Sequence, residues 1–123
     1  MFEVSVREDF SAAHRLRGYP GKCENVHGHN WVVEAFVRCE RLDDTGITVD
    51  FKEIKEALRS VLAAFDHKDL NQLEPFDKDN PSSENIARYV YRKLSESLNS
   101  PAITVSKVSV CETPDACATY WEE

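Results

Sequence analysis

Hydrophobic periodicity changes twice along this 123-residue chain, from strand-like to helical and back to strand-like. Apolar and charged residues alternate from Phe2 to Val6 and again in HNWVVEAFVRCE, residues 29–40. This alternation predicts two strands, because successive side chains of a strand face opposite sides. Between them, GYPG at residues 18–21 is typical of a turn. We therefore expect the two runs to pair as a long antiparallel hairpin.

Two helices are predicted in the middle of the chain. Apolar residues recur at helical spacing from Phe51 to Ala64, and Asp50 is the expected N-cap of this helix. The second helix is expected to begin near Ser82 or Ser83, either of which can cap it. It ends before Pro101, because the residue that precedes a proline favours extended geometry.

Strand-like alternation returns in AITVSKVSVCE, residues 102–112, and in CATYWEE, residues 117–123. The predicted order is thus two strands, two helices and two strands. Four antiparallel strands with two helices on one face form a two-layer α+β architecture, and residues 1–123 fit one domain. Such a sheet has two open edges, so we expect these edges to be blunted or the chain to oligomerise through them.

The composition excludes several functional classes. Acidic residues outnumber basic ones by 22 to 15, and no basic run stands out, which argues against direct nucleic acid binding. The apolar runs fall far short of the about 20 residues that cross a bilayer, and MFEVSVRED lacks the pattern of a secretory signal. We therefore expect a cytoplasmic chain without a membrane partner, whose four cysteines stay reduced. Three of them are expected to be packing residues of strands: Cys39, Cys111 and Cys117.

Two of the four histidines flank a single glycine in KCENVHGHNW, residues 22–31. On a strand, His27 and His29 point to the same side, about 6–7 Å apart, and His14 can face them from the first strand. Three neutral imidazoles suit zinc and leave a fourth position open, as in catalytic sites. An H-x-H pair alone is more often a surface turn, but a third histidine in register favours the metal site. Cys23 leaves an alternative open, because as a fourth ligand it would close a structural site.

Two further acidic side chains are candidates for the chemistry. Asp66 immediately precedes His67, and a carboxylate beside an imidazole suits proton transfer near neutral pH. An isolated pair of this kind is usually solvated, so its role depends on the metal site. Glu112 ends a predicted strand, where an exposed glutamate is the simpler interpretation. The functional alternative is a carboxylate that accepts two N–H groups from a planar heterocycle.

Six motifs occur in one order along nearly the whole chain: FSAAHRL, CENVHGHN, VDF, DHKDLN, PSSENIA and CET. Together they resemble the 6-pyruvoyl-tetrahydropterin synthase family. The three residues between Cys23 and His27 are similar to the spacing in its bacterial branch. The resemblance implies the tunnelling fold, in which the sheets of three subunits close into a barrel, and such closure removes open edges. It also implies a homohexamer of two stacked trimers, with active sites between subunits.

The resemblance further implies the chemistry of the site. The substrate would be 7,8-dihydroneopterin triphosphate, and the products 6-carboxytetrahydropterin, acetaldehyde and triphosphate, in queuosine biosynthesis. The residues that match functional positions of the family are the zinc ligands His14, His27 and His29, the catalytic thiol of Cys23, the proton relay of Asp66 and His67, and the pterin anchor Glu112.

Three alternatives to this reaction stay open. The first is the pyruvoyl-forming reaction, which eliminates triphosphate at the same site without cleaving the side chain. The second is a non-catalytic zinc domain in which Cys23 is the fourth ligand. The third and most remote is a histidine-ligated zinc hydrolase. The groups that hold the triphosphate have no clear signature, and the candidates are the basic residues near the motifs: Arg15, Arg17, Lys22 and Lys68.

Overall fold

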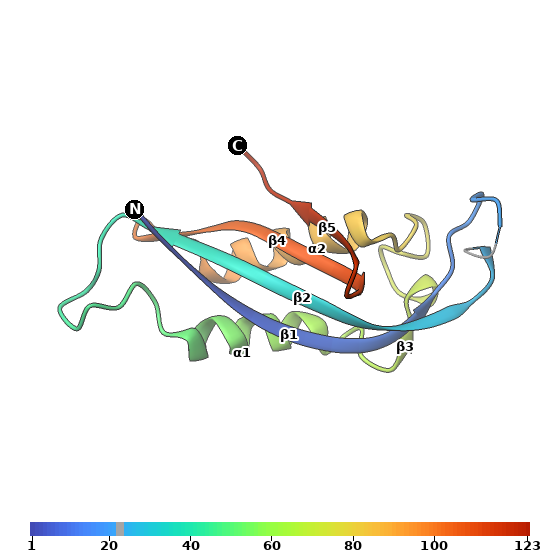
Figure 1. Ribbon diagram of the computed structural model, residues 1–123, viewed down its shortest axis with the longest axis horizontal. Helices are drawn as coiled ribbons and strands as arrows, with labels where there is room; N and C mark the ends of the chain where they lie inside the picture. The colour runs from blue at the N-terminus through green and yellow to red at the C-terminus, as the bar shows by residue number, and fades with distance from the viewer. Residues whose placement is uncertain (22–23) are drawn as a thin grey trace.

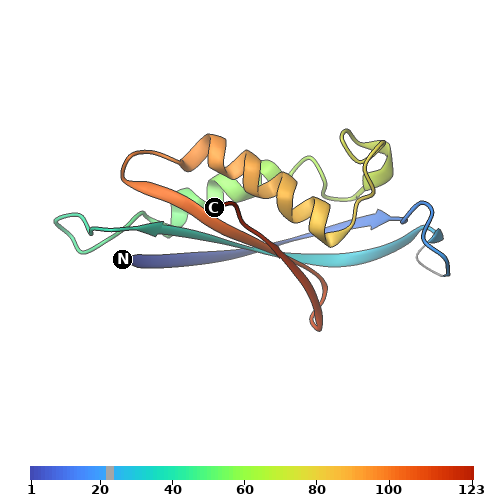
Figure 2. The same cartoon turned by 90° about the horizontal axis from the view of Figure 1, so that it is seen from above.

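The computed structural model of the protein describes residues 1–21 and 24–123. Cys23, the expected catalytic thiol, lies outside the described residues. The rest of the chain forms one curved sheet with two helices on one of its faces, which leaves the opposite face of the sheet uncovered (Figures 1 and 2). The two-layer α+β architecture predicted from the sequence is therefore confirmed.

The sheet is built around a long hairpin of β1 (Phe2–His14) and β2 (His27–Cys39), which pair along their whole length. Over the described residues the strand order is β3-β1-β2-β4-β5. The remaining elements are α1 (Phe51–Leu62), β3 (Lys68–Asp69), the 3-10 turn η2 (Leu70–Gln72), α2 (Ser83–Leu98), β4 (Ile103–Thr113) and β5 (Ala116–Tyr120).

The four long strands are antiparallel, as predicted, but β3 was not predicted. It pairs parallel to β1 over two residues, which are too few to produce a periodic pattern. The first helix ends at Leu62, slightly earlier than the predicted Ala64. None of the helices in the described part of the chain is long and apolar enough to cross a bilayer.

The core lies between the hairpin and the helices. Trp31, Val33, Ala35 and Val37 of β2 are fully buried, in the alternation that the sequence predicts. Phe10 of β1 stacks on Trp31, with 5.9 Å between ring centroids. The helices close the core with buried side chains at helical spacing: Ile54 and Leu58 from α1, and Ile86, Val90 and Leu94 from α2. Burial of each large apolar side chain stabilises the fold by about 1.5–3 kcal/mol.

Both helices begin at the capping residues that the sequence indicates. The Asp50 side chain accepts a hydrogen bond from the backbone of Lys52 at 2.8 Å, and Ser82 accepts one from Asn85 at 3.1 Å. A cap of this kind stabilises a helix by about 1 kcal/mol. Ser82 matters for the site, because it fixes the start of α2 directly after Pro81, which contacts His14.

The expectation that all cysteines stay reduced packing residues is wrong for Cys111 and Cys117, which form a disulfide. The two residues are direct partners in the β4–β5 ladder, and Cys117 is exposed. The sequence pattern indicated that each lies on a strand, but not that the strands place them opposite each other. Cys39 is a buried free thiol, as expected, and donates a hydrogen bond to the carbonyl of Arg41 at 2.8 Å.

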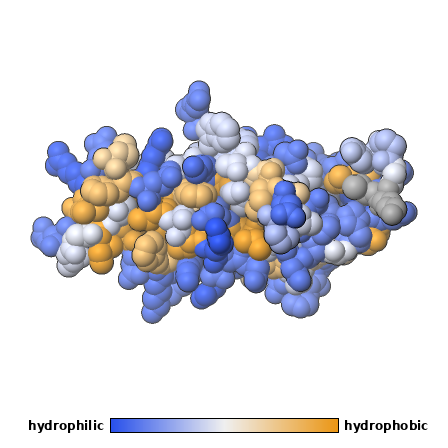
Figure 3. Space-filling view, viewed as in Figure 1, coloured by the Kyte–Doolittle hydropathy of each residue, from blue (hydrophilic) through white to orange (hydrophobic). Residues whose placement is uncertain are grey.

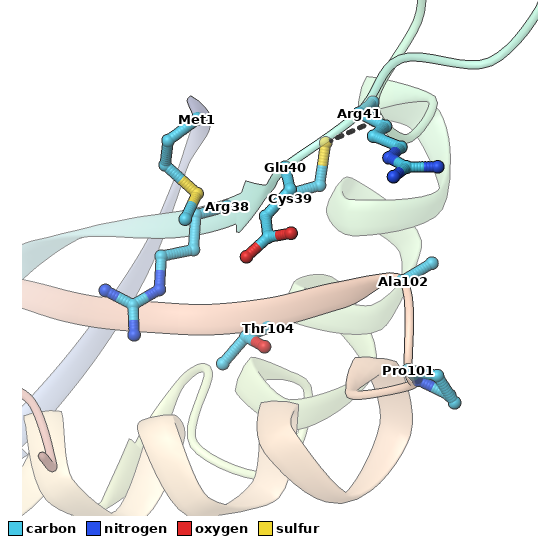
Figure 4. Close-up of a pocket in the computed structure, with 8 residues that line it drawn as sticks. All are labelled: Met1, Arg38, Cys39, Glu40, Arg41, Pro101, Ala102 and Thr104. Carbon is cyan, nitrogen blue, oxygen red and sulfur yellow. Dashed lines mark hydrogen bonds between the residues drawn. The ribbon is translucent and has the colours of Figure 1, made fainter.

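A hollow of about 470 Å³ lies where β1 begins and β2 ends (Figure 4). Figure 4 shows Met1, residues from the end of β2 and residues from the start of β4 around it. The hydrogen bond from Cys39 to Arg41 runs along its upper edge in this view. This hollow is at the opposite end of the hairpin from His14, about 40 Å away along the strand. It is therefore separate from the histidines.

Candidate metal centre and active site

Three histidines meet at the end of the β1–β2 hairpin, on the face that carries the core. His14 and His27 are direct partners in the ladder, and His29 pairs with Ala12 two positions further along. Ring centroids are 4.5 Å apart for His14 and His27, 5.4 Å for His14 and His29, and 4.9 Å for His27 and His29. One ring nitrogen of each lies within 4.8 Å of the others. The facing arrangement predicted from the sequence is confirmed.

Two of the three rings are oriented by hydrogen bonds at Nδ1. His14 donates from Nδ1 to the carbonyl of Pro81 at 2.7 Å, and His27 donates from Nδ1 to the carbonyl of Asn25 at 2.7 Å. A carbonyl can only accept, so both rings carry a proton on Nδ1, and the neutral form of such a ring has its lone pair on Nε2. Histidines that bind metals are oriented in this way by their second nitrogen.

Nε2 of His14 and Nε2 of His29 are buried and make no hydrogen bond to any described residue. A buried polar atom without a partner costs about 1–3 kcal/mol. A divalent ion would supply the missing partner to both atoms. Zinc–nitrogen bonds of about 2.0–2.1 Å allow two ligand atoms to be at most about 4 Å apart, so small side-chain rotations would close the cluster around zinc. The residues present fit such an ion.

The protonation state of His14 also suits a metal ligand. Burial lowers the pKa of His14 below its usual value, and the neighbouring His27 and His29 lower it further. The hydrogen bond to Pro81 and the charge of Glu112 raise this pKa, but they do not outweigh burial. His14 is therefore neutral at neutral pH, and metal binding requires no loss of a proton from it.

Glu112 reaches the histidine cluster from β4. Its Oε2 lies 3.7 Å from Nε2 of His14 and 3.6 Å from Nε2 of His29. These distances are too long for hydrogen bonds, so the carboxylate lies close to the histidine rings but makes no hydrogen bond to them. Its side chain is 35% exposed, which leaves room for the oxygens to accept hydrogen bonds from a ligand. Glu112 is therefore not a fully solvated residue at a strand end.

Asp66 and His67 lie at the outer edge of β1. Oδ1 of Asp66 accepts a hydrogen bond from the backbone of Ser11 at 2.9 Å and is 3.1 Å from Nδ1 of His67. The bond from Ser11, followed by the bond from His67, lowers the pKa of Asp66. The side chain of His67 is 81% exposed, and its backbone has a φ of 59°, which is uncommon for a residue other than glycine.

Over the described residues, Asp66 and His67 are not joined to the histidine cluster. No hydrogen bond or ion pair between described residues connects Asp66 or His67 with His14, His27, His29 or Glu112. The chain thus brings together four of the seven predicted site residues, places two on an open edge, and leaves Cys23 outside the described residues.

Sequence reasoning missed the groups that support the cluster. Trp31 packs against His14 and His29, with ring centroids 4.8 Å and 5.3 Å away, and its Nε1 donates to the carbonyl of Ala12 at 3.2 Å. Its alternation with the histidines was visible, but it indicated only a core position. The Pro81 carbonyl could not be found in the sequence, because a backbone acceptor has no residue signature.

This fold and this cluster define a class: a two-layer α+β protein with a three-histidine centre at the end of its central hairpin. A model of the family "6-pyruvoyl tetrahydropterin synthase" matches residues 3–123. The chain belongs to this family, which confirms the resemblance drawn from the motifs.

Relatives of this chain carry two different names. 6-Pyruvoyl tetrahydrobiopterin synthase of Drosophila melanogaster is 34% identical over 131 residues, covering 95% of this chain and 77% of its own. 6-Carboxy-5,6,7,8-tetrahydropterin synthase of Bacillus subtilis is 34% identical over 128 residues, covering 97% of this chain and 84% of its own. The solved structure of Caenorhabditis elegans 6-pyruvoyl tetrahydropterin synthase has a TM-score of 0.87 and 32% identity, covering 99% of this chain and 96% of its own.

Proposed function

We propose that this protein is a zinc-dependent carbon–carbon lyase that converts 7,8-dihydroneopterin triphosphate to 6-carboxytetrahydropterin, acetaldehyde and triphosphate, a step of queuosine biosynthesis. The observation that carries the proposal is the meeting of three histidines, two of them with their Nδ1 protons engaged, beside the Glu112 carboxylate in a member of this family. Zinc held by His14, His27 and His29 would act as a Lewis acid on the oxygens of the substrate side chain.

Glu112 would bind the pterin ring. A carboxylate that accepts two N–H groups from a flat heterocycle fixes both its position and its orientation. Because Oε2 is 3.6–3.7 Å from the two histidine nitrogens, a ring bound there would lie next to His14 and His29. The substrate side chain would then extend over the histidines.

The proton transfers are assigned to Cys23 and to the pair of Asp66 and His67. For Cys23 the support is the motif alone, and its role would be that of a base, whose thiol pKa a nearby metal lowers. Asp66 holds the ring of His67 through Nδ1, which suits an imidazole that exchanges protons at its other nitrogen. The left-handed backbone of His67 is a further indication of function, since strained residues gather at functional sites.

The position of this pair supports an active site shared between subunits. Asp66 and His67 lie on the edge of the sheet formed by β1, where β3 covers only two residues. A second chain that extends this sheet would bring its own histidine cluster towards the exposed His67. We propose a homohexamer of two trimers, in which an isolated chain is inactive.

An apolar surface also supports self-association. Phe2, Leu42, Ile47 and Phe51 are all exposed and line one hollow. Figure 3 shows apolar side chains gathered at the end of the molecule that carries the N-terminus, among charged neighbours. Exposed apolar groups of this kind are typical of interaction surfaces.

The product distinguishes this reaction from the pyruvoyl-forming one, in which triphosphate is eliminated without side-chain cleavage. The Drosophila melanogaster and Bacillus subtilis relatives, one of each name, are both 34% identical to this chain, so identity does not choose between the two reactions. The three residues between Cys23 and His27 favour the carboxy product, because that short spacing is similar to the bacterial branch.

The test is the product spectrum, measured by mass spectrometry, of zinc-loaded protein incubated with 7,8-dihydroneopterin triphosphate. Cys23→Ala, assayed for zinc content, is the comparison. We expect carboxytetrahydropterin and acetaldehyde from the wild type, and no turnover from a variant that retains its zinc. Pyruvoyltetrahydropterin would identify the alternative reaction. Loss of zinc from Cys23→Ala, with an inactive wild type, would instead indicate a structural zinc domain.

A further inference from the structure

Two asparagines hold the chain that follows His14. Asn71 accepts from the backbone N–H of Arg15 at 2.8 Å and donates to its carbonyl at 3.0 Å. Asn80 does the same to Arg17, with both distances at 2.9 Å. Each side-chain amide thereby replaces the pair of hydrogen bonds that a neighbouring strand would make. These two asparagines, which we call the asparagine clamp, hold the three residues that follow β1 at Arg15 and Arg17.

The clamp is connected to His14 through the segment before α2. Asn80 directly precedes Pro81, whose carbonyl accepts the Nδ1 proton of His14. The carbonyl of Asn80 in turn accepts from the side chain of Asn85 at 2.8 Å, and Ser82 caps α2. The Pro81 carbonyl is therefore held by bonds on both of its flanking residues.

His14 and Pro81 are 67 positions apart in the chain, so the geometry of their hydrogen bond depends on how the two segments that contain them are held together. The clamp bonds these segments side by side, from Asn71 and Asn80 to the residues just after His14, and the guanidinium of Arg17 adds a bond to the carbonyl of Phe76 at 3.0 Å. If the Pro81 carbonyl moves away, the His14 ring loses the acceptor that keeps its proton on Nδ1. A proton on Nε2 would then occupy the lone pair that faces His27 and His29.

We propose that Asn71 and Asn80 are positioning residues for the metal centre: they hold the Pro81 carbonyl against His14 and so keep Nε2 of His14 free to bind the ion. The inference rests on the proposed function, because it concerns the same histidines. It adds residues that contact neither the ion nor the substrate. Removal of a group that bonds directly to a metal ligand, as the Pro81 carbonyl bonds to His14, weakens metal binding by about 10–100-fold, and the asparagines act through that carbonyl.

The experiment compares Asn71→Ala and Asn80→Ala with the control Asn99→Ala. Asn99 also accepts a hydrogen bond from a backbone amide, that of Val105 at 2.7 Å, but at the far end of α2. The first measurement, on metal-free protein, is the tautomer of His14 from the ¹⁵N shifts of its ring nitrogens. The second is the zinc dissociation constant by competition with a chelator, with the visible absorption of bound Co²⁺ as a report of geometry.

We expect the Nδ1–H tautomer in the wild type and in Asn99→Ala. In both clamp variants we expect a mixture of tautomers, an altered Co²⁺ spectrum, and zinc binding that is about 10–100-fold weaker. Unchanged tautomer and zinc affinity in a folded clamp variant would overturn the inference. Equal weakening in Asn99→Ala would also overturn it, because the effect would then be general destabilisation. Should Asn71→Ala not fold, Asn80→Ala decides alone, since Asn80 is only half-buried.

The pterin assay of the wild type separates this inference from the proposed function. A wild type that binds zinc and shows the clamp effect, but has no lyase activity, would refute the function and leave the clamp intact. An active wild type whose clamp variants keep tautomer and affinity would refute the clamp alone. A metal-free wild type with its proton on Nε2 of His14 contradicts the inference whatever the activity.

Discussion

Replacement of His29 by phenylalanine should have opposite effects on stability with and without metal. Nε2 of His29 is buried without a hydrogen-bond partner among the described residues, and its side chain is 20% exposed. Phenylalanine fills nearly the same space and removes the unpaired atom. In metal-free protein, His29→Phe should therefore raise the free energy of unfolding.

The magnitude follows from the cost of the unpaired atom. A buried polar group without a partner costs about 1–3 kcal/mol, and the larger phenylalanine ring offsets part of the gain, which leaves about 1 kcal/mol. With zinc at about 1,000 times its dissociation constant, the wild type gains about 4 kcal/mol that the variant lacks. In zinc the order of stability should therefore reverse, and the wild type should be more stable than His29→Phe by about 3 kcal/mol.

The assay is urea unfolding at one fixed protein concentration, with chelator in one series and zinc in the other, because oligomerisation makes stability depend on concentration. His67→Ala is the matched control: its side chain is 81% exposed, so we expect changes within about 0.5 kcal/mol in both series. A variant His29→Phe that is less stable than the wild type in chelator would refute the reasoning. So would equal stabilisation of both proteins by zinc.

Two further predictions concern His14 and Glu112. The pKa of His14 is lowered in the folded state, so below about pH 6.5 the unfolded state binds more protons than the folded state. The free energy of unfolding of metal-free protein should therefore fall as the pH decreases below this value. A urea midpoint that does not change across that range would contradict the prediction. Glu112→Gln should reduce kcat/KM by about 10–100-fold, because hydrogen bonds to a charged acceptor are lost. It should leave the zinc content unchanged, because Oε2 is 3.6 Å or more from the histidine nitrogens. Zinc loss in this variant would mean that Glu112 is a metal ligand.

The sequence predicted those parts of the molecule that have a repeating pattern or a local signal. The alternation in β1 and β2 predicted the hairpin, and the parity of His14, His27 and His29 predicted that they face one another. Capping residues located the helices. In each case the feature is determined by residues that are close together in the sequence.

The parts that could not be predicted depend on contacts between distant segments. Asn71 and Asn80 bind backbone atoms of residues 56 and 63 positions away, which no local pattern reveals. The same limit explains the error at Cys111 and Cys117, whose pairing depends on strand register. The separation of Asp66 and His67 from the histidines was not predicted either, because a motif names residues without giving the distances between them.

The register of β1 against β2 serves the core and the histidines at once. Phe10 faces Trp31 and His14 faces His27 in one uninterrupted ladder. A slip by a single residue would turn the apolar side chains to the uncovered face and separate the imidazoles in the same step. A stably folded chain therefore already has its histidines aligned, and no later maturation of the pocket is needed. With the proposed ion at these histidines, metal uptake would serve as a folding reporter, since chains with the hairpin out of register would bind no zinc, whatever their content of secondary structure.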